Sequence, residues 1–184
     1  MDISKEKILD FYLDAIKLKE IMRRGWLQKG LSSAESVADH TYGVCILSLL
    51  FATIYKLNVP KVLIMALIHD IPEINIGDIT PLDNFPSGKK QILEEDEAKK
   101  IFSNIDDSNE LFNLWMEFEY QLSEEGKLVK QIDKLEVAFQ SFIYQKEKNI
   151  NFDDFYSSVA ECIDNKDLHY ILDELQNRLT QIKQ

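Results

Sequence analysis

The segment VLIMALIHDIPEINIGDITP, residues 62–81, joins a continuous apolar run to a cluster of polar groups. A proline two residues before it suits the first turn of a helix, where a missing N–H costs little. We therefore predict a helix that begins at this proline and ends near His69. Asp70 follows at once, and two more carboxylates lie in the turn-rich connection beyond it, Glu73 and Asp78. Long connections of this kind often carry functional residues.

Helical periodicity continues on both sides of this segment. Apolar residues at three- and four-residue spacing predict a first helix over residues 5–23, followed by a glycine-bounded loop. Ser36 and Asp39 have the spacing of a capping box, so a second helix is expected from Ser36 to about residue 57. No segment shows the alternation that is typical of a strand. Further helices are predicted over residues 88–102, 107–122, 124–146, 151–162 and 166–182.

The composition fits one compact helical domain. The chain has 184 residues, 45% of them apolar, with six glycines and four prolines. That length suits a single core, and the scarcity of turn-forming residues favours helices. We predict an all-α fold, a single-domain helical bundle of roughly six to eight helices.

The net charge argues against two classes of partner. The formal charge at pH 7 is −11, from 21 basic and 32 acidic side chains. Such a surface repels nucleic-acid polymers and anionic membranes, so we expect neither as a partner. The start MDISKEK has no apolar signal region, and the longest apolar run, residues 62–68, is too short to cross a bilayer. Cys45 and Cys162 are expected to be reduced core thiols, and the protein is expected to be cytoplasmic.

Histidine and aspartate occur in segments that are otherwise apolar. His40 begins the stretch HTYGVCILSLLFA, and Asp133 lies within LVKQIDKLEVAF, between valines four residues away on either side. Neutral imidazole nitrogens and anionic carboxylate oxygens suit a divalent ion such as Zn, Mn, Co or Fe. The simpler interpretations are a capped helix end at His69 and Asp70, and a salt bridge from Asp133 to a lysine such as Lys130.

Three motifs carry a resemblance to a known family. They are ESVADH, ALIHDIPEINIGDITP and LVKQIDKLE, with GW before the first and LWMEFE before the last. Together they resemble the HD-domain metal-dependent phosphohydrolases, in particular the YfbR-type 5′-deoxynucleotidases and the related eukaryotic HD-domain nucleotidases. The resemblance implies one HD domain over residues 1–184. Its metal-site core would span about 25–136, and the C-terminal helices, 151–184, would pack on that core.

The resemblance also implies roles for individual side chains. Glu73 and Asp78 would act in catalysis, one on the attacking water and the other in proton transfer, with Asp78 the candidate for the water. The sequence does not separate these two roles, and the simpler interpretation of both is that they cap backbone amides in the loop. One divalent metal ion (Mn, Co, Zn, Fe or Mg) would be bound by His40, His69, Asp70 and Asp133.

A nucleotide is the substrate that the resemblance implies. YfbR-type members carry an arginine immediately before the tryptophan, where this chain has Gly25, so Arg23 or Arg24 would supply the phosphate contact. Trp26 would form a pocket wall that senses the 2′ position of the sugar. The implied activity is hydrolysis of (deoxy)nucleoside 5′-monophosphates to nucleoside and inorganic phosphate, by a homodimer.

Two other functions are compatible with these residues. One is an HD-family phosphodiesterase or pyrophosphohydrolase on another nucleotide; the chain lacks an HHE…GYP motif and the extra histidines of dinuclear sites, which disfavours it. The other is a non-catalytic helical interaction module with a structural metal ion. Glu73 and Asp78 beside the proposed ligands disfavour that second function, because a structural site has no need of them.

Overall fold

The computed structural model describes residues 4–83, 85–86, 88–105, 109–148, 150 and 152–182. Within these ranges the chain is helical and contains one isolated β-bridge, between Met22 and Ser36. The all-α prediction is confirmed. The described helices of ten residues or more are α1 (Lys5–Ala15), α3 (Val37–Tyr55), α4 (Val59–Ile68), α6 (Lys89–Ile105), α7 (Glu110–Glu119), α8 (Glu124–Lys148), α9 (Asp153–Cys162) and α10 (Lys166–Ile182). Three short elements, α2 (Arg24–Gln28), α5 (Glu73–Ile76) and a 3₁₀ turn, η2 (Pro81–Asp83), lie in the connections.

The first predicted helix, residues 5–23, is too long. The α-helix ends at Ala15 and continues as one 3₁₀ segment, η1 (Ile16–Lys19). The chain then becomes extended, because it pairs with the segment before α3. The Val37 N–H donates to the Ile21 carbonyl at 2.8 Å, and the Arg23 N–H donates to the Glu35 carbonyl at 2.9 Å. These long-range bonds replace the helical bonds that periodicity alone predicts.

Local sequence signals determine how α3 and α4 begin. At α3 both bonds of the predicted capping box are present, between Ser36 and Asp39. At α4 the side chain of Asn58 accepts a hydrogen bond from the Lys61 N–H, and a proline occupies the first turn. These caps satisfy donors that a helix start leaves free. They fix the points from which α3 and α4 enter the core.

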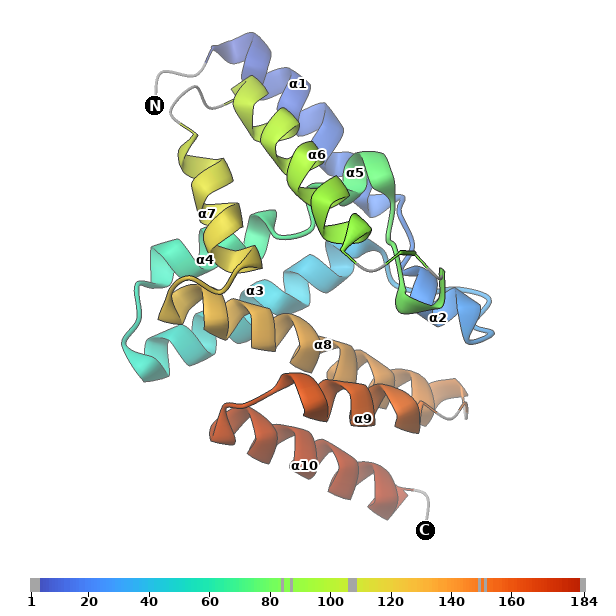
Figure 1. Ribbon diagram of the computed structural model, residues 1–184. Helices are drawn as coiled ribbons and strands as arrows, with labels where there is room; N and C mark the ends of the chain where they lie inside the picture. Colours follow the sequence, from blue (N-terminus) through green and yellow to red (C-terminus); the bar gives the residue numbers. More distant parts are fainter. Residues whose placement is uncertain are drawn as a thin grey trace.

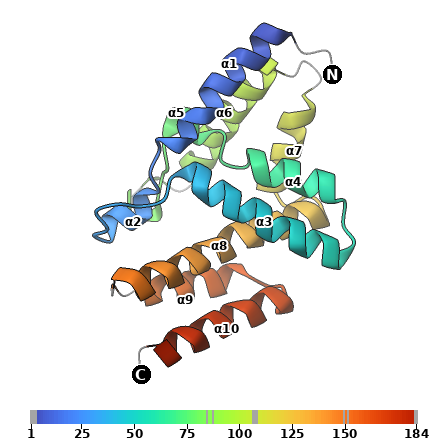
Figure 2. The ribbon, with the colours of Figure 1, turned by 180° about the vertical axis from the view of Figure 1, so that it is seen from behind.

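Helix α8 lies between α3 on one side and α9 and α10 on the other (Figure 1). Helices α1, α6 and α7 lie at the opposite end of the molecule from α10, and the view from behind shows the same order (Figure 2). Four leucines of α10 spaced three or four residues apart are buried in the main core: Leu168, Leu172, Leu175 and Leu179. Burying each such side chain stabilises the fold by about 1.5–3 kcal/mol.

Two sequence-based expectations need revision. Both cysteines are free, but Cys162, at the end of α9, is exposed instead of buried, and Cys45 is half-buried. By length and composition α3 could also span a membrane, although its apolar stretches are interrupted by polar residues. Core helices pass the same test, and α3 packs on α4 and α8 with a buried face that includes His40 and Ser48.

Candidate metal centre

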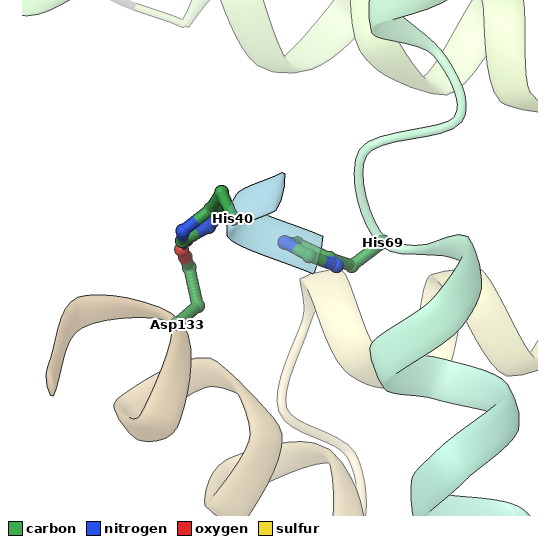
Figure 3. A group of neighbouring side chains, drawn as sticks. All are labelled: His40, His69 and Asp133. Atoms are coloured by element: carbon green, nitrogen blue, oxygen red, sulfur yellow. Dashed lines mark hydrogen bonds and ion pairs between the residues drawn. The ribbon is translucent and has the colours of Figure 1, made fainter. Parts of the chain in front are cut away.

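Three buried side chains from distant parts of the chain lie close together, and we call their meeting point the centre (Figure 3). His40 comes from the first turn of α3, His69 from the C-terminal end of α4 and Asp133 from the middle of α8. Their possible ligand atoms all lie within 4.8 Å of one another. Two imidazoles and a carboxylate at this spacing are a suitable donor set for a divalent transition metal.

The ring of His40 is held from both sides. Its Nδ1 lies 2.6 Å from Glu136 Oε2, and its Nε2 lies 3.0 Å from Asp133 Oδ1. In the neutral form that a metal ligand requires, a proton on Nδ1 satisfies the glutamate and the Nε2 lone pair is directed into the centre. Gly43, one turn after His40, makes room for this arrangement, because a Cβ there would lie only 2.6 Å from Glu136 Oε1.

His69 also presents one nitrogen to the centre. Its Nδ1 donates to the Ala66 carbonyl at 2.7 Å, and Trp115 Nε1 donates to the His69 carbonyl at 3.0 Å. Among the described residues, His69 Nε2 and Asp70 Oδ2 are buried without a hydrogen-bond partner, although the two atoms lie 3.2 Å apart. Buried polar atoms without partners are costly, and a bound cation would satisfy both. The residues therefore fit a metal ion.

The charge balance supports the same interpretation. Burial and Arg23 lower the pKa of His40, but Asp133 and Glu136 outweigh them and raise this pKa to about 9. Burial alone would raise the pKa of Asp70, yet His69 and His40 hold it well below its ordinary value. The centre thus carries enough negative charge to stabilise a cation in its midst.

Cations surround the centre without filling it. Arg23, whose side chain is 16% exposed, places Nη1 3.6 Å from Asp70 Oδ2 and 3.9 Å from Asp78 Oδ1. Burial would lower the pKa of Arg23, but these two carboxylates raise it, so the side chain remains a cation. Lys134 Nζ lies 2.9 Å from Asp133 Oδ2. The salt bridge to a lysine suggested from sequence is therefore present, but Lys130 is not the partner, because it pairs with a glutamate of α7.

The two candidate catalytic carboxyls lie beside this centre. Glu73 is 3% exposed, and its Oε2 has no hydrogen-bond partner among the described residues. Burial, together with the nearby Asp70 and Asp78, raises the pKa of Glu73 well above its ordinary value. Asp78 Oδ2 accepts the backbone N–H of Arg24 at 2.5 Å. Asp78 therefore bonds a backbone amide, as in the simpler interpretation, but that amide belongs to the start of α2 and not to its own loop, while its other oxygen faces Arg23.

A cavity of about 490 Å³ opens onto the centre. This volume is in the usual range for small-molecule sites. His69, Asp70, Glu73, Asp78 and Asp133 line it, and Arg23, Trp26, Lys134 and Phe155 form other parts of its wall. Arg24 is not among the lining residues. Its guanidinium Nη2 instead bonds Asp83 Oδ1 at 2.7 Å, with half of the side chain exposed.

Trp26 is a rigid part of the cavity wall. It is 2% exposed, and its ring stacks on Phe155 of α9 at a centroid distance of 4.6 Å. Tyr144 and Phe152 contact the indole edge-on, each at 5.3 Å. The indole Nε1 donates to Glu35 Oε1 at 2.8 Å.

Sequence reasoning missed three charged residues near the centre: Glu35, Glu136 and Lys134. Glu136 could have been found, because it lies one helical turn after Asp133 and so shares its face. Lys134 has no such signal, since it is adjacent to Asp133 in sequence. Glu35 lies in the irregular segment before α3, where periodicity predicts nothing.

Comparison with known proteins agrees with this geometry. The HD domain family matches residues 15–176. The chain belongs to the HD domain family. The human 5′-deoxynucleotidase HDDC2 is 33% identical to this HD-domain protein over 173 residues, which cover 92% of this chain and 84% of the human one. The predicted resemblance to HD-domain phosphohydrolases is thereby confirmed.

Solved structures show the same fold. A Pyrococcus horikoshii OT3 protein superposes with a TM-score of 0.79 at 32% identity, covering 95% of this chain and 99% of that one. The HD phosphohydrolase of cyanophage S-2L, solved with dA and one catalytic Zn²⁺ ion, has a TM-score of 0.53 at 19% identity, covering 93% of this chain and 95% of that one. At that identity the likeness concerns the fold alone.

Proposed function

We propose that this HD-domain protein is a metal-dependent phosphomonoesterase that hydrolyses (deoxy)nucleoside 5′-monophosphates to nucleoside and inorganic phosphate. One observation carries the proposal: unpartnered ligand atoms of His69 and Asp70 lie at the wall of a 490 Å³ cavity that the cation Arg23 also lines. The relatives named 5′-deoxynucleotidase, which match over most of the chain, support the nucleotide as substrate.

The metal site that we propose consists of His40, His69, Asp70 and Asp133. The donor set suits Mn, Co, Zn, Fe or Mg to different degrees, with the two imidazoles favouring the transition metals. When bound, such an ion supplies Lewis-acid activation of the phosphoryl group and of water. The protein contributes the fixed orientation of the ligands, through Glu136 on His40 and the Ala66 carbonyl on His69.

Three side chains act on the substrate itself in this proposal. Arg23 binds the phosphate, because its cationic guanidinium lines the cavity between two carboxylates. Asp78 orients the attacking water, and its own position is fixed by the N-terminus of α2. Glu73, a buried carboxyl with a free oxygen, supplies the proton to the leaving ribose oxygen. Placing these groups in advance accounts for most of what phosphoryl transfer requires of a protein.

Trp26 gives the proposed preference for deoxynucleotides. The stacked and hydrogen-bonded indole cannot move easily, so it forms a stiff wall against the sugar. A 2′-hydroxyl would meet that wall, whereas a 2′-methylene would pack against it. Steric discrimination of this kind is typically about 10²-fold.

We further propose that the protein is a homodimer in which α3 meets its symmetry mate. Tyr42, Ile46, Leu50 and Ile54 follow one helical face and are 69%, 43%, 54% and 65% exposed. Residues 41–55 contain no charged side chain, so two copies of an acidic chain meet there without like-charge repulsion. Light scattering should give twice the monomer mass for the wild type and the monomer mass for Ile54→Lys. A monomeric wild type would disprove this assembly.

We also place the protein in the cytoplasm, a compartment in which free thiols such as Cys45 and Cys162 persist. Imaging of a fluorescent fusion in the source cell would test this. A signal confined to another compartment would contradict it.

The function is tested by phosphate release from every deoxy- and ribonucleoside monophosphate. The metal-stripped protein and the protein loaded with each divalent ion should be compared, and cyclic nucleotides and nucleoside triphosphates belong in the same panel. We expect metal-dependent release from monophosphates. Turnover of cyclic nucleotides or triphosphates alone would indicate the phosphodiesterase or pyrophosphohydrolase alternative. Metal binding without any turnover would indicate the non-catalytic module.

A further inference from the structure

Glu35 is a half-buried residue that contacts the cavity wall without lining the cavity. Its carboxylate Oε1 accepts the indole N–H of Trp26 at 2.8 Å. Its backbone carbonyl accepts the Arg23 N–H at 2.9 Å, and its own N–H donates to the Tyr144 hydroxyl at 2.7 Å. One residue in an irregular segment thus connects both groups that we assign to substrate binding.

The three bonds have different consequences for the wall. The backbone bond to Arg23 fixes where the chain enters α2, and the backbone bond to Tyr144 attaches residue 35 to α8. Both can persist whatever side chain occupies position 35. The carboxylate bond fixes the rotation of the indole, whose flat face already stacks on Phe155. Among the contacts of the indole described above, this hydrogen bond is the directional one, because stacking and edge contacts tolerate some sliding of the ring.

We propose that Glu35 is a positioning residue for the substrate pocket: its carboxylate sets the orientation of Trp26 and thereby the sugar selectivity. The kinetic part of this inference rests on the proposed nucleotidase function, whereas the structural part does not. Among the described residues, Glu35 makes no hydrogen bond to a proposed metal ligand, although its carboxylate lies within 4.8 Å of possible ligand atoms of His40 and Glu136. Its carboxylate bonds Trp26 instead, on the substrate side of the site. Glu136, bonded to His40, acts on the metal side.

The structural part is tested by NMR of the two indole N–H groups, those of Trp26 and Trp115. A Trp26→Phe variant assigns the resonances. In Glu35→Ala the Trp26 signal should move upfield and exchange faster with water, while the Trp115 signal, bonded to the His69 carbonyl, stays in place. Glu35→Gln retains an acceptor oxygen and should keep the Trp26 signal near its original position. An unmoved Trp26 signal in Glu35→Ala would overturn the proposal.

The kinetic part compares kcat/KM for dAMP and AMP. Glu35→Ala should lower the dAMP/AMP ratio about tenfold, part of the discrimination that a steric wall provides. Glu35→Gln should keep the ratio near that of the wild type. The affinity for Mn²⁺, measured by calorimetry, should fall less in both variants than in Glu136→Ala, because Glu136 and not Glu35 bonds His40. In a Trp26→Phe background, Glu35→Ala should have no further effect, because the two changes act through one interaction.

Glu117→Ala is the matched control. Glu117 is also a partly buried glutamate with a bonded partner, Lys61, but it does not line the cavity. The Glu117→Ala variant should leave the Trp26 resonance and the ratio of kcat/KM for dAMP and AMP unchanged. An equal fall of both kcat/KM values in Glu35→Ala, with the ratio preserved, would show that Glu35 is merely structural. If the wild type hydrolyses no nucleotide, the proposed function fails, and the indole resonance still decides whether Glu35 holds Trp26.

Discussion

Glu136 Oε2 lies 2.6 Å from His40 Nδ1, so a carboxylate from α8 fixes the ring of a histidine from α3. The two residues are 96 positions apart in sequence. Because the other ring nitrogen faces Asp133, this bond decides which nitrogen is available to a metal ion.

Replacing Glu136 should therefore weaken metal binding. We expect Glu136→Ala to lower the affinity for Mn²⁺ or Zn²⁺ about 10–100-fold, since the orienting bond to His40 is lost. Competition with a chromogenic chelator measures this affinity directly, without reference to activity. An affinity equal to that of the wild type would show that Glu136 does not orient the ligand.

The two adjacent arginines should behave differently. Arg23→Gln should lower kcat/KM for a nucleoside monophosphate about a hundredfold, because a preorganised cation at the phosphate is lost. Arg24→Gln removes only the exposed pair with Asp83, so the change should be less than about fivefold. Steady-state kinetics of the two variants side by side provide the comparison. Equal losses would refute the assignment of Arg23.

Trp26→Ala should reduce the preference for deoxynucleotides more than it reduces turnover of dAMP. Removing the wall relieves the clash with the 2′-hydroxyl, so kcat/KM for AMP should stay level or rise. The ratio of kcat/KM for dAMP and AMP is the quantity to measure in both proteins. A parallel fall in both values would make Trp26 a purely structural residue.

Gly126, in the first turn of α8, should not tolerate a side chain. A Cβ there would lie 2.4 Å from the backbone carbonyl oxygen of Glu117, where α7 and α8 pack closely. Gly126→Ala should destabilise the fold by about 1–3 kcal/mol, as overpacking usually does. Gly25→Ala is a suitable control, since its nearest neighbour would be at 3.9 Å. Urea denaturation of both variants gives the comparison, and equal stability of the two would contradict this view of the α7–α8 contact.

The sequence predicts most of what depends on local signals. The capping box of Ser36 and the extents of α4 and α10 could be predicted because caps and periodicity act within a few residues. The end of α1 and the bonding of residues 21–23 with 35–37 could not, because they depend on contacts distant in sequence.

In the site, too, some features follow from sequence patterns and others depend on contacts between distant parts of the chain. The order of His40, the His69–Asp70 pair and Asp133 along the chain carries the resemblance to the HD-domain family, and that resemblance implies one metal centre. Which arginine enters the cavity depends on where α2 begins, and neighbouring positions look alike in sequence. Glu35 lies outside any periodic segment, so only the folded chain reveals its contact with Trp26.

Metal reconstitution tests the central claim most directly. The protein is stripped with a chelator and then titrated with Mn²⁺ while phosphate release from dAMP is followed, with Asp70→Ala as the control that lacks one proposed ligand. We predict no release from the stripped protein, a rise that levels off at one equivalent of metal, and no recovery in the variant. Full phosphate release from the stripped protein, or from Asp70→Ala with its metal content unchanged, would contradict the account.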